Sequence, residues 1–193
     1  MTYAAADLER VFAEQLRAVA GALSALNADF MLIGGLAVGV WGEPRGTKDA
    51  DFSVHVATSA DDLRSGLAAT GLQVSGGDLA RAVAQAGSVR LRRTDHQDDP
   101  IAVDLLVATT PFEIDALSRR RPVRVLGVDL PVVAPEDLFV FNLIAGRPQD
   151  LADAALLHEL HGEAFNLPRV RRWCAEFRVE DRLTSFVSSA GRP

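Results

Sequence analysis

The chain has only one cysteine, Cys174, among its 193 residues. A single thiol excludes an intramolecular disulfide. Because Cys174 stands beside Trp173 in an amphipathic stretch, we expect a buried thiol in a reducing compartment. These features predict a cytoplasmic protein.

Long apolar segments are also missing. No run of 18 apolar residues occurs, and the first residues lack both a basic n-region and an uninterrupted apolar h-region. We therefore expect neither a membrane span nor a signal peptide, and no membrane partner.

Positive charge is scarce. The formal net charge is −6, which argues against a protein whose whole surface grips nucleic acid but leaves a local basic groove open. Of the 20 basic residues only Lys48 is a lysine. Genomic composition explains such a bias, yet this lysine lies inside a charged motif, so a functional role is the alternative.

Hydrophobic residues make up 48% of the chain and charged residues 24%, which is enough for a substantial core. We expect two parts, an α/β core over residues 1–133 and a helical part over 134–193 that packs on the core as one unit. Residues 72–89 are ambiguous. Apolar periodicity and turn signals predict helices over residues 5–26, 36–41, 58–71, 78–86, 111–117, 135–145, 150–161, 168–178 and 180–188.

Short apolar runs predict the strands. The two runs 90–93 and 101–107 flank a polar turn, so we expect them to pair antiparallel. The runs 123–126 and 128–133 flank Gly127 and predict a hairpin. The expected strands are 30–33, 51–56, 90–93, 101–107, 123–126 and 128–133.

Asp49 and Asp51 stand where charge meets an apolar strand. Residues i and i+2 of a strand point to the same face, roughly 6 to 7 Å apart at about 3.3 Å per residue. Like charges this close repel unless a cation lies between them. The spacing therefore indicates a cation site.

Asp104 is the one acid inside the apolar strand 101–107. A carboxylate there needs a metal, an arginine or solvent. Pairing with Arg90 or Arg92 across the strands is the structural interpretation. Beside Asp49 and Asp51, the alternative is a set of three catalytic, metal-binding acids that holds two Mg²⁺ ions about 4 Å apart, as for displacement at phosphorus.

The residues around these acids suit a triphosphate. Gly34 and Gly35 leave backbone amides open to a ligand at the start of a short helix. Arg45 and Lys48 bring positive charge, and Thr47 brings a hydroxyl donor. We therefore predict an NTP site at these five residues.

The chain resembles the nucleotidyltransferase superfamily, and within it the AbiEii-type toxins of bacterial toxin–antitoxin systems. The resemblance covers residues 30–160. It is carried by Ile33-Gly-Gly-Leu-Ala37, by Arg45-x-Thr47-x-Asp49-x-Asp51, by Asp104, and by Pro135-Glu-Asp-Leu138 with Ala145-Gly-Arg147-x-x-Asp150-x-x-Asp153.

This resemblance implies a mixed α/β (α+β) nucleotidyltransferase sheet flanked by helices, with a helical C-terminal part. It also implies Mg²⁺-dependent transfer of a nucleotide from an NTP to an acceptor, in several relatives the 3′ end of tRNA, under the control of an antitoxin. Asn142 takes the place of a lysine that contacts the triphosphate in similar proteins. By the same likeness Asn142, Arg147 and Asp150 belong to the nucleotide site.

Two alternatives remain open from the sequence. The acceptor could be an aminoglycoside-like antibiotic or a protein side chain, since the acidic net charge suits a cationic drug. Asn142 also allows a nucleotide-binding module without turnover.

Several arginines and two histidines outside this motif are also considered as functional residues. Arg119 to Arg121, with Arg169, Arg171 and Arg172, could form the basic surface that an RNA acceptor requires, or be plain solvated faces. His158 and His161 lack the i, i+4 spacing of a zinc protease helix and are expected to be surface or capping residues.

Overall fold

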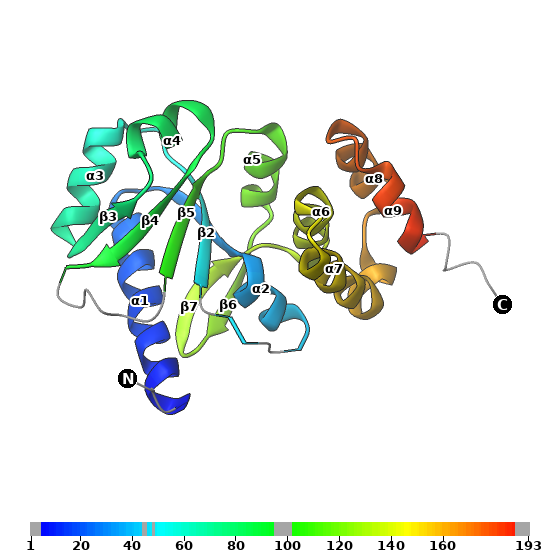
Figure 1. Ribbon diagram of the computed structural model, residues 1–193, viewed down its shortest axis with the longest axis horizontal. Helices are drawn as coiled ribbons and strands as arrows, with labels where there is room; N and C mark the ends of the chain where they lie inside the picture. The colour runs from blue at the N-terminus through cyan, green and yellow to red at the C-terminus, as the bar shows by residue number, and fades with distance from the viewer. Residues whose placement is uncertain (1–4, 44–45, 48, 95–101, 188–193) are drawn as a thin grey trace.

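The computed structural model of the chain describes residues 5–43, 46–47, 49–94 and 102–187. Within these residues seven strands form one mixed sheet in the order β3-β4-β5-β2-β1-β7-β6. Helices surround the sheet, and α6 to α9 gather at one end of the molecule beyond α5, away from α3 and α4 (Figure 1). The expected mixed sheet flanked by helices is confirmed.

The strands are short, with five to seven residues each. The sheet consists of β1 (Asp29–Ile33), β2 (Asp49–His55), β3 (Leu72–Gly76), β4 (Ser88–Arg93), β5 (Ala102–Val107), β6 (Arg121–Val125) and β7 (Val128–Val132).

Strand β2 lies at the middle of the sheet. It runs antiparallel to β1 and parallel to β5. Strand β4 pairs antiparallel with β5, as the sequence predicted, and β1 pairs parallel with β7. The N-terminal end of β2 therefore meets the C-terminal end of β1, and the acids of β2 come next to the start of α2.

Helices occupy most of the remaining described residues. They are α1 (Ala5–Ala25), α2 (Gly34–Trp41), α3 (Ala60–Ala69), α4 (Leu79–Gln85), α5 (Pro111–Ser118), α6 (Pro135–Ala145), α7 (Pro148–His161), α8 (Leu167–Glu176) and α9 (Glu180–Val187), with a short 3-10 turn at Gly162–Ala164.

The core joins one face of α1 to the sheet. Phe12, Leu16 and Leu23 recur at helical spacing and are buried. On β2, Phe52 and Val54 are buried completely. Burial of these side chains removes apolar surface from water and fixes the strands that carry the acids.

Several boundaries differ from the sequence prediction by one or two residues, and one strand was missed. Strand β2 begins at Asp49 rather than at residue 51, so both acids are strand residues. Strand β3 was not predicted, because it lies at the sheet edge, only Leu72 of its residues is buried, and its register shifts between Val74 and Gly76. The helix expected over 78–86 is confirmed as α4.

The C-terminal helices contact the rest of the chain through aromatic rings. The ring of Phe112 on α5 lies 4.7 Å from that of Phe141, 5.4 Å from that of Trp173 and 5.7 Å from that of Phe177, measured between centroids. These contacts join α5 to α6 and α8. That residues 134–193 and the core behave as one folding unit remains a prediction.

The sequence has a single cysteine and no long apolar segment, and the structure tests the expectations drawn from these two features. Cys174 is buried, and burial raises the pKa of its thiol to about 11, so it is no thiolate nucleophile at neutral pH. Among the described helices none is long and apolar enough to span a bilayer. The cytoplasmic location remains a prediction.

Candidate active site

A row of side chains crosses the centre of the sheet. Asp51 on β2 is the register partner of Ile33 on β1 and of Asp104 on β5. Asp104 is in turn the register partner of Arg90 on β4. Register partners on adjacent strands point to the same face, so the two carboxylates and the guanidinium lie side by side.

Asp49 joins this row from two residues earlier on β2. It is exposed and shares a sheet face with Asp51, as residues i and i+2 of a strand do. The Thr47 hydroxyl donates to the Asp49 carbonyl at 3.2 Å, and the Asp49 amide lies 3.4 Å from the same hydroxyl oxygen. Thr47 therefore fixes the chain where it enters β2.

Gly34 connects β1 to α2 directly beside Asp51. Its φ is +66°, and a β-carbon there would overlap Oδ2 of Asp51. Only glycine combines this backbone conformation with so close an approach. Ile33 at the N-cap position provides no side-chain cap, so the first amides of α2, at Gly34 and Gly35, can donate to a ligand.

The far end of α2 is anchored through Trp41. Its indole Nε1 donates to the Val133 carbonyl at 2.7 Å, and His161 Nε2 donates to the Trp41 carbonyl at 2.6 Å. These bonds attach α2 to the segment before α6 and to the end of α7. His161 therefore has a structural role, in line with the capping role expected for it.

The acids line one wall of a cleft of about 860 Å³, within the range of about 300 to 1,000 Å³ typical of ligand sites. Helices α6 and α7 supply the opposite wall. The cleft brings together these predicted site residues: Gly34, Gly35, Thr47, Asp49, Asp51, Asp104, Asn142, Arg147 and Asp150.

Asn142 lines this cleft and has a buried side-chain donor without a partner in the described part of the chain. The residue is 7% exposed, and its side-chain Nδ2 has no hydrogen-bond partner among the described residues. An unsatisfied buried donor costs about 1 to 3 kcal/mol. That Asn142 contributes to a nucleotide site remains a prediction, and its Nδ2 donor is the feature of this residue that a ligand contact would satisfy.

Arg147 and Asp150 form a tight pair at the start of α7. The Arg147 guanidinium donates from Nε to Oδ2 at 2.7 Å and from Nη2 to Oδ1 at 3.0 Å, and the Arg147 amide donates to Oδ2 at 3.0 Å. Asp150 is buried, whereas the Arg147 side chain is 79% exposed. Asp150 therefore orients an arginine that remains accessible at the cleft mouth.

The electrostatics of the row centre on Asp51. Burial, followed by the charges of Asp104 and Asp49, raises the pKa of Asp51 from 3.8 to about 6, while Arg147 and Arg90 act in the opposite direction. The nearby arginines thus fail to balance the three carboxylates. A cation at the row would remove this repulsion.

The residues fit a hard divalent cation, although the described side chains do not form a ready cluster of three or more metal ligands. Both oxygens of Asp104 accept hydrogen bonds from Arg90, at 2.9 Å and 2.8 Å. Carboxylate oxygens are the ligands that Mg²⁺ prefers, and the absent β-carbon of Gly34 leaves room at Asp51. Asp49, Asp51 and Asp104 are thus suitable ligands once Asp104 is released.

Two predicted nucleotide-binding residues, Arg45 and Lys48, lie outside the described residues. The sequence prediction also overlooked the two other charged residues of the cleft wall, Arg90 and Asp153, as members of the site. Arg90 was considered only as a structural partner of Asp104, and that pairing is present. The Asp153 carboxylate accepts a hydrogen bond from Gln149 at 2.9 Å. In the sequence, the Asp150-x-x-Asp153 spacing was the feature that could have identified Asp153 as a site residue.

Most of the arginines considered for RNA binding are engaged within the protein. Arg119 and Arg169 bind the buried Asp137, at 3.1 Å and 3.0 Å. Arg120 binds Asp29 at 2.7 Å. These side chains link α5, α6, α8 and β1, so they form no free basic surface.

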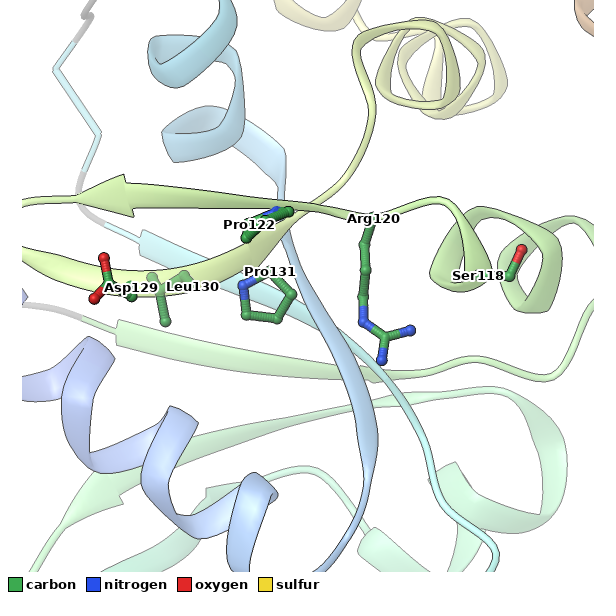
Figure 2. A pocket seen from close by; sticks show the side chains of 6 residues that line it. All are labelled: Ser118, Arg120, Pro122, Asp129, Leu130 and Pro131. Carbon is green, nitrogen blue, oxygen red and sulfur yellow. The ribbon is translucent and has the colours of Figure 1, made fainter.

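A separate hollow of about 480 Å³ lies beside the β6–β7 hairpin (Figure 2). Figure 2 shows Pro122 and Pro131 on neighbouring strands and Arg120 extending from the end of α5. Arg120, the one cation among its lining residues, is paired with Asp29. This hollow lacks the convergent acids and amides of the cleft.

The fold is similar to several solved structures, one of which is described as nucleotidyltransferase-like. The antibiotic-resistance factor ANT(2'')-Ia matches with a TM-score of 0.56 at 12% identity, over 91% of this chain and 95% of that one. An antigenic nucleotidyltransferase-like protein from Paracoccidioides brasiliensis matches with a TM-score of 0.51 at 20% identity, over 81% and 77%. JHP933 from Helicobacter pylori matches with a TM-score of 0.52 at 17% identity, over 96% and 79%.

No curated protein sequence matches the chain significantly. The model of one protein family, described as the nucleotidyl transferase AbiEii toxin of a Type IV toxin–antitoxin system, matches residues 17–188. This match includes every described residue of the cleft. The chain therefore belongs to the AbiEii family of nucleotidyl transferase toxins.

Proposed function

We propose that the protein transfers a nucleotide from an NTP to the 3′ end of tRNA in a Mg²⁺-dependent reaction, as the cytoplasmic toxin of a bacterial toxin–antitoxin pair. The observation that carries the chemistry is the row of Asp51 and Asp104, with Asp49 beside it, which faces α6 and α7 across one cleft and adjoins the start of α2. The cognate antitoxin follows from the family.

The three acids would hold the metal, and the opposite groups would hold the nucleotide. When bound, Mg²⁺ lowers the pKa of the attacking hydroxyl and neutralises charge on the leaving pyrophosphate. The acceptor oxygen forms a bond to the α-phosphorus, the bond from that phosphorus to pyrophosphate breaks, and the hydroxyl proton passes to solvent.

Each remaining residue has a role in binding. The amides of Gly34 and Gly35 donate to phosphate oxygens at the positive end of α2. Asn142 Nδ2 supplies a neutral donor from α6, and Arg147 supplies charge from α7. Arg45, Thr47 and Lys48 belong to the same phosphate site by their place in the motif.

A cationic antibiotic is the second candidate acceptor. The cleft is lined by five carboxylates, those of Asp49, Asp51, Asp104, Asp150 and Asp153, against the two described cations Arg90 and Arg147. This excess of negative charge suits a polyamine more than a polyanion. The likeness to ANT(2'')-Ia concerns the fold alone.

The experiment is label transfer with each of the four NTPs carrying a label at the α-phosphate, in the presence of Mg²⁺. Total tRNA, an aminoglycoside and a protein mixture serve as parallel acceptors. We expect label in tRNA, no label when the γ-phosphate is labelled instead, and a loss of at least about 100-fold in Asp51→Asn.

Asp129→Asn is the matched control, because Asp129 is an exposed aspartate on the β6–β7 hairpin that pairs with Arg124 at 3.5 Å. Label in the aminoglycoside but not in tRNA would establish the second candidate. NTP-dependent thermal stabilisation without any labelled product would establish a binding module.

A further inference from the structure

Arg90 is bound to Asp104, one of the three carboxylates that a metal at the row would use as ligands. Its guanidinium donates from Nε to Oδ1 of Asp104 at 2.9 Å and from Nη2 to Oδ2 at 2.8 Å. This two-bond geometry engages both oxygens of Asp104. A cation that binds all three acids of the row must therefore compete with Arg90.

The pair is placed so that such an exchange costs little. The side chain of Arg90 is 48% exposed and that of Asp104 is 22% exposed. Solvent reaches both side chains, so water can replace the two hydrogen bonds that are lost when the guanidinium leaves Asp104. Arg90 also lines the cleft itself, so its guanidinium can leave Asp104 and stay beside the ligand.

Arg90 experiences the field of the whole row. It is the register partner of Asp104, which is in turn the register partner of Asp51, and all three line the same cleft as Asp49. The guanidinium thus serves as the counterion of the three carboxylates. It does so in the part of the cleft where the metal is expected.

We propose that Arg90 is the resident counterion of the row, that a divalent cation displaces its guanidinium from Asp104, and that the freed guanidinium then binds an oxygen of the triphosphate. This inference rests on the proposed function, since the cation and the triphosphate are those of nucleotide transfer. Arg90 therefore weakens the binding of metal alone and couples metal binding to nucleotide binding.

The direct test is Mn²⁺ binding to the nucleotide-free full chain, followed by electron paramagnetic resonance and calorimetry. We expect Arg90→Gln to bind Mn²⁺ about threefold to tenfold more tightly than the wild type, because Asp104 is released. Arg90→Lys keeps the positive charge but cannot form the two parallel hydrogen bonds to Asp104. It should therefore also bind Mn²⁺ more tightly. Arg124→Gln removes an equal charge from the β6–β7 hairpin and should change nothing.

The second measurement repeats the titration with a non-hydrolysable NTP analogue. In the wild type the analogue should tighten Mn²⁺ binding, and in Arg90→Gln this coupling should shrink by a factor of at least about three. A positioning role is thereby separated from a purely structural one, which would alter neither the affinity for metal nor the coupling.

Outcomes for the inference and for the proposed function are distinguishable. If the wild type binds Mn²⁺ and Asp51→Asn does not, but neither Arg90 variant binds it more tightly, the role of Arg90 is refuted while the metal site stands. If no form of the chain binds Mn²⁺, both fail. Should Arg90→Gln not fold, Arg90→Lys carries the same test, with circular dichroism as the check of folding.

Discussion

A β-carbon on Gly34 would lie 2.9 Å from Cγ of Asp51. This relationship joins the start of α2 to the centre of the acidic row. Gly34 therefore determines both the backbone conformation at this turn and the geometry of the site.

Gly34→Ala should therefore damage the site more than the fold. A left-handed alanine costs about 1 to 2 kcal/mol of stability, and the added carbon pushes the Asp51 carboxylate out of the row. We expect nucleotide transfer to fall by at least about 100-fold. Urea denaturation and label transfer measure the two effects.

The control is Gly127→Ala in the β6–β7 turn, where φ is +76° and nothing lies within 4 Å of the added carbon. It should lose similar stability and keep full activity. Equal activity losses in both variants would contradict the role of Gly34.

The raised pKa of Asp51 predicts a pH-dependent stability. Since its pKa rises from 3.8 to about 6 on folding, the folded state binds more protons than the unfolded chain between these values. The contribution of Asp51 to stability is therefore present below about pH 4 and is lost as the pH rises through about 6.

Asp51→Asn removes this titration. The variant should be more stable than the wild type at pH 8, and the difference in melting temperature should vanish near pH 4. Mg²⁺ at pH 8 should stabilise the wild type and leave the variant unchanged. A difference in melting temperature that stays constant with pH would contradict the assigned cause.

Asn142→Leu should change stability and nucleotide binding in opposite directions. Because the Nδ2 donor is buried without a partner, its removal should stabilise the free protein by about 1 kcal/mol. Affinity for an NTP should fall about fivefold or more, because a ligand hydrogen bond is lost. Thermal denaturation with and without NTP measures both.

Asn166→Ala is the contrasting variant. Asn166 caps α8 by accepting from the Arg169 amide at 3.2 Å, so its loss should destabilise the protein by about 1 kcal/mol without any effect on NTP affinity. If Asn142→Leu behaves in the same way, its amide has no role in the ligand site.

Arg169→Met should destabilise the whole protein. Arg169 donates to Asp137, whose side chain is 1% exposed, and also pairs with Asp115 on α5. Removal of one partner leaves a buried carboxylate short of a cation and costs roughly 3 to 5 kcal/mol. Arg124→Met, which breaks an exposed pair, should cost less than about 1 kcal/mol.

The same variant tests whether residues 134–193 fold with the core. If they form one unit, calorimetry of Arg169→Met should show a single transition at a lower temperature. Two separate transitions would instead show that the helical part unfolds independently.

The sequence predicted the site better where its residues are close in the chain. Asp49 and Asp51 were placed on one strand face because the period of a strand is two. Gly34 and Gly35 were placed at the start of a helix because of the apolar run before them. These inferences need only local geometry.

What the sequence did not predict depends on distant pairing. Asp104 was grouped with Asp49 and Asp51 from the sequence, but the register that sets Asp51 directly beside Asp104 could not be predicted, because it is fixed by contacts between strands more than 50 residues apart. Edge strand β3 has too few buried residues for a clear pattern. Arg119 and Arg169 looked like solvated or RNA-binding charge because their partner Asp137 comes from another helix.

The anchoring of α2 through Trp41 gives the protein an optical reporter. Trp41 and Trp173 are its two tryptophans. The Trp41 indole lies 6.4 Å from the His161 ring and beneath the Arg121 guanidinium, whereas Trp173 packs against Phe112 between α5 and α8. In Trp173→Phe, fluorescence emission reports on α2 alone, and a shift on addition of NTP would record the helix responding to phosphate at its opposite end.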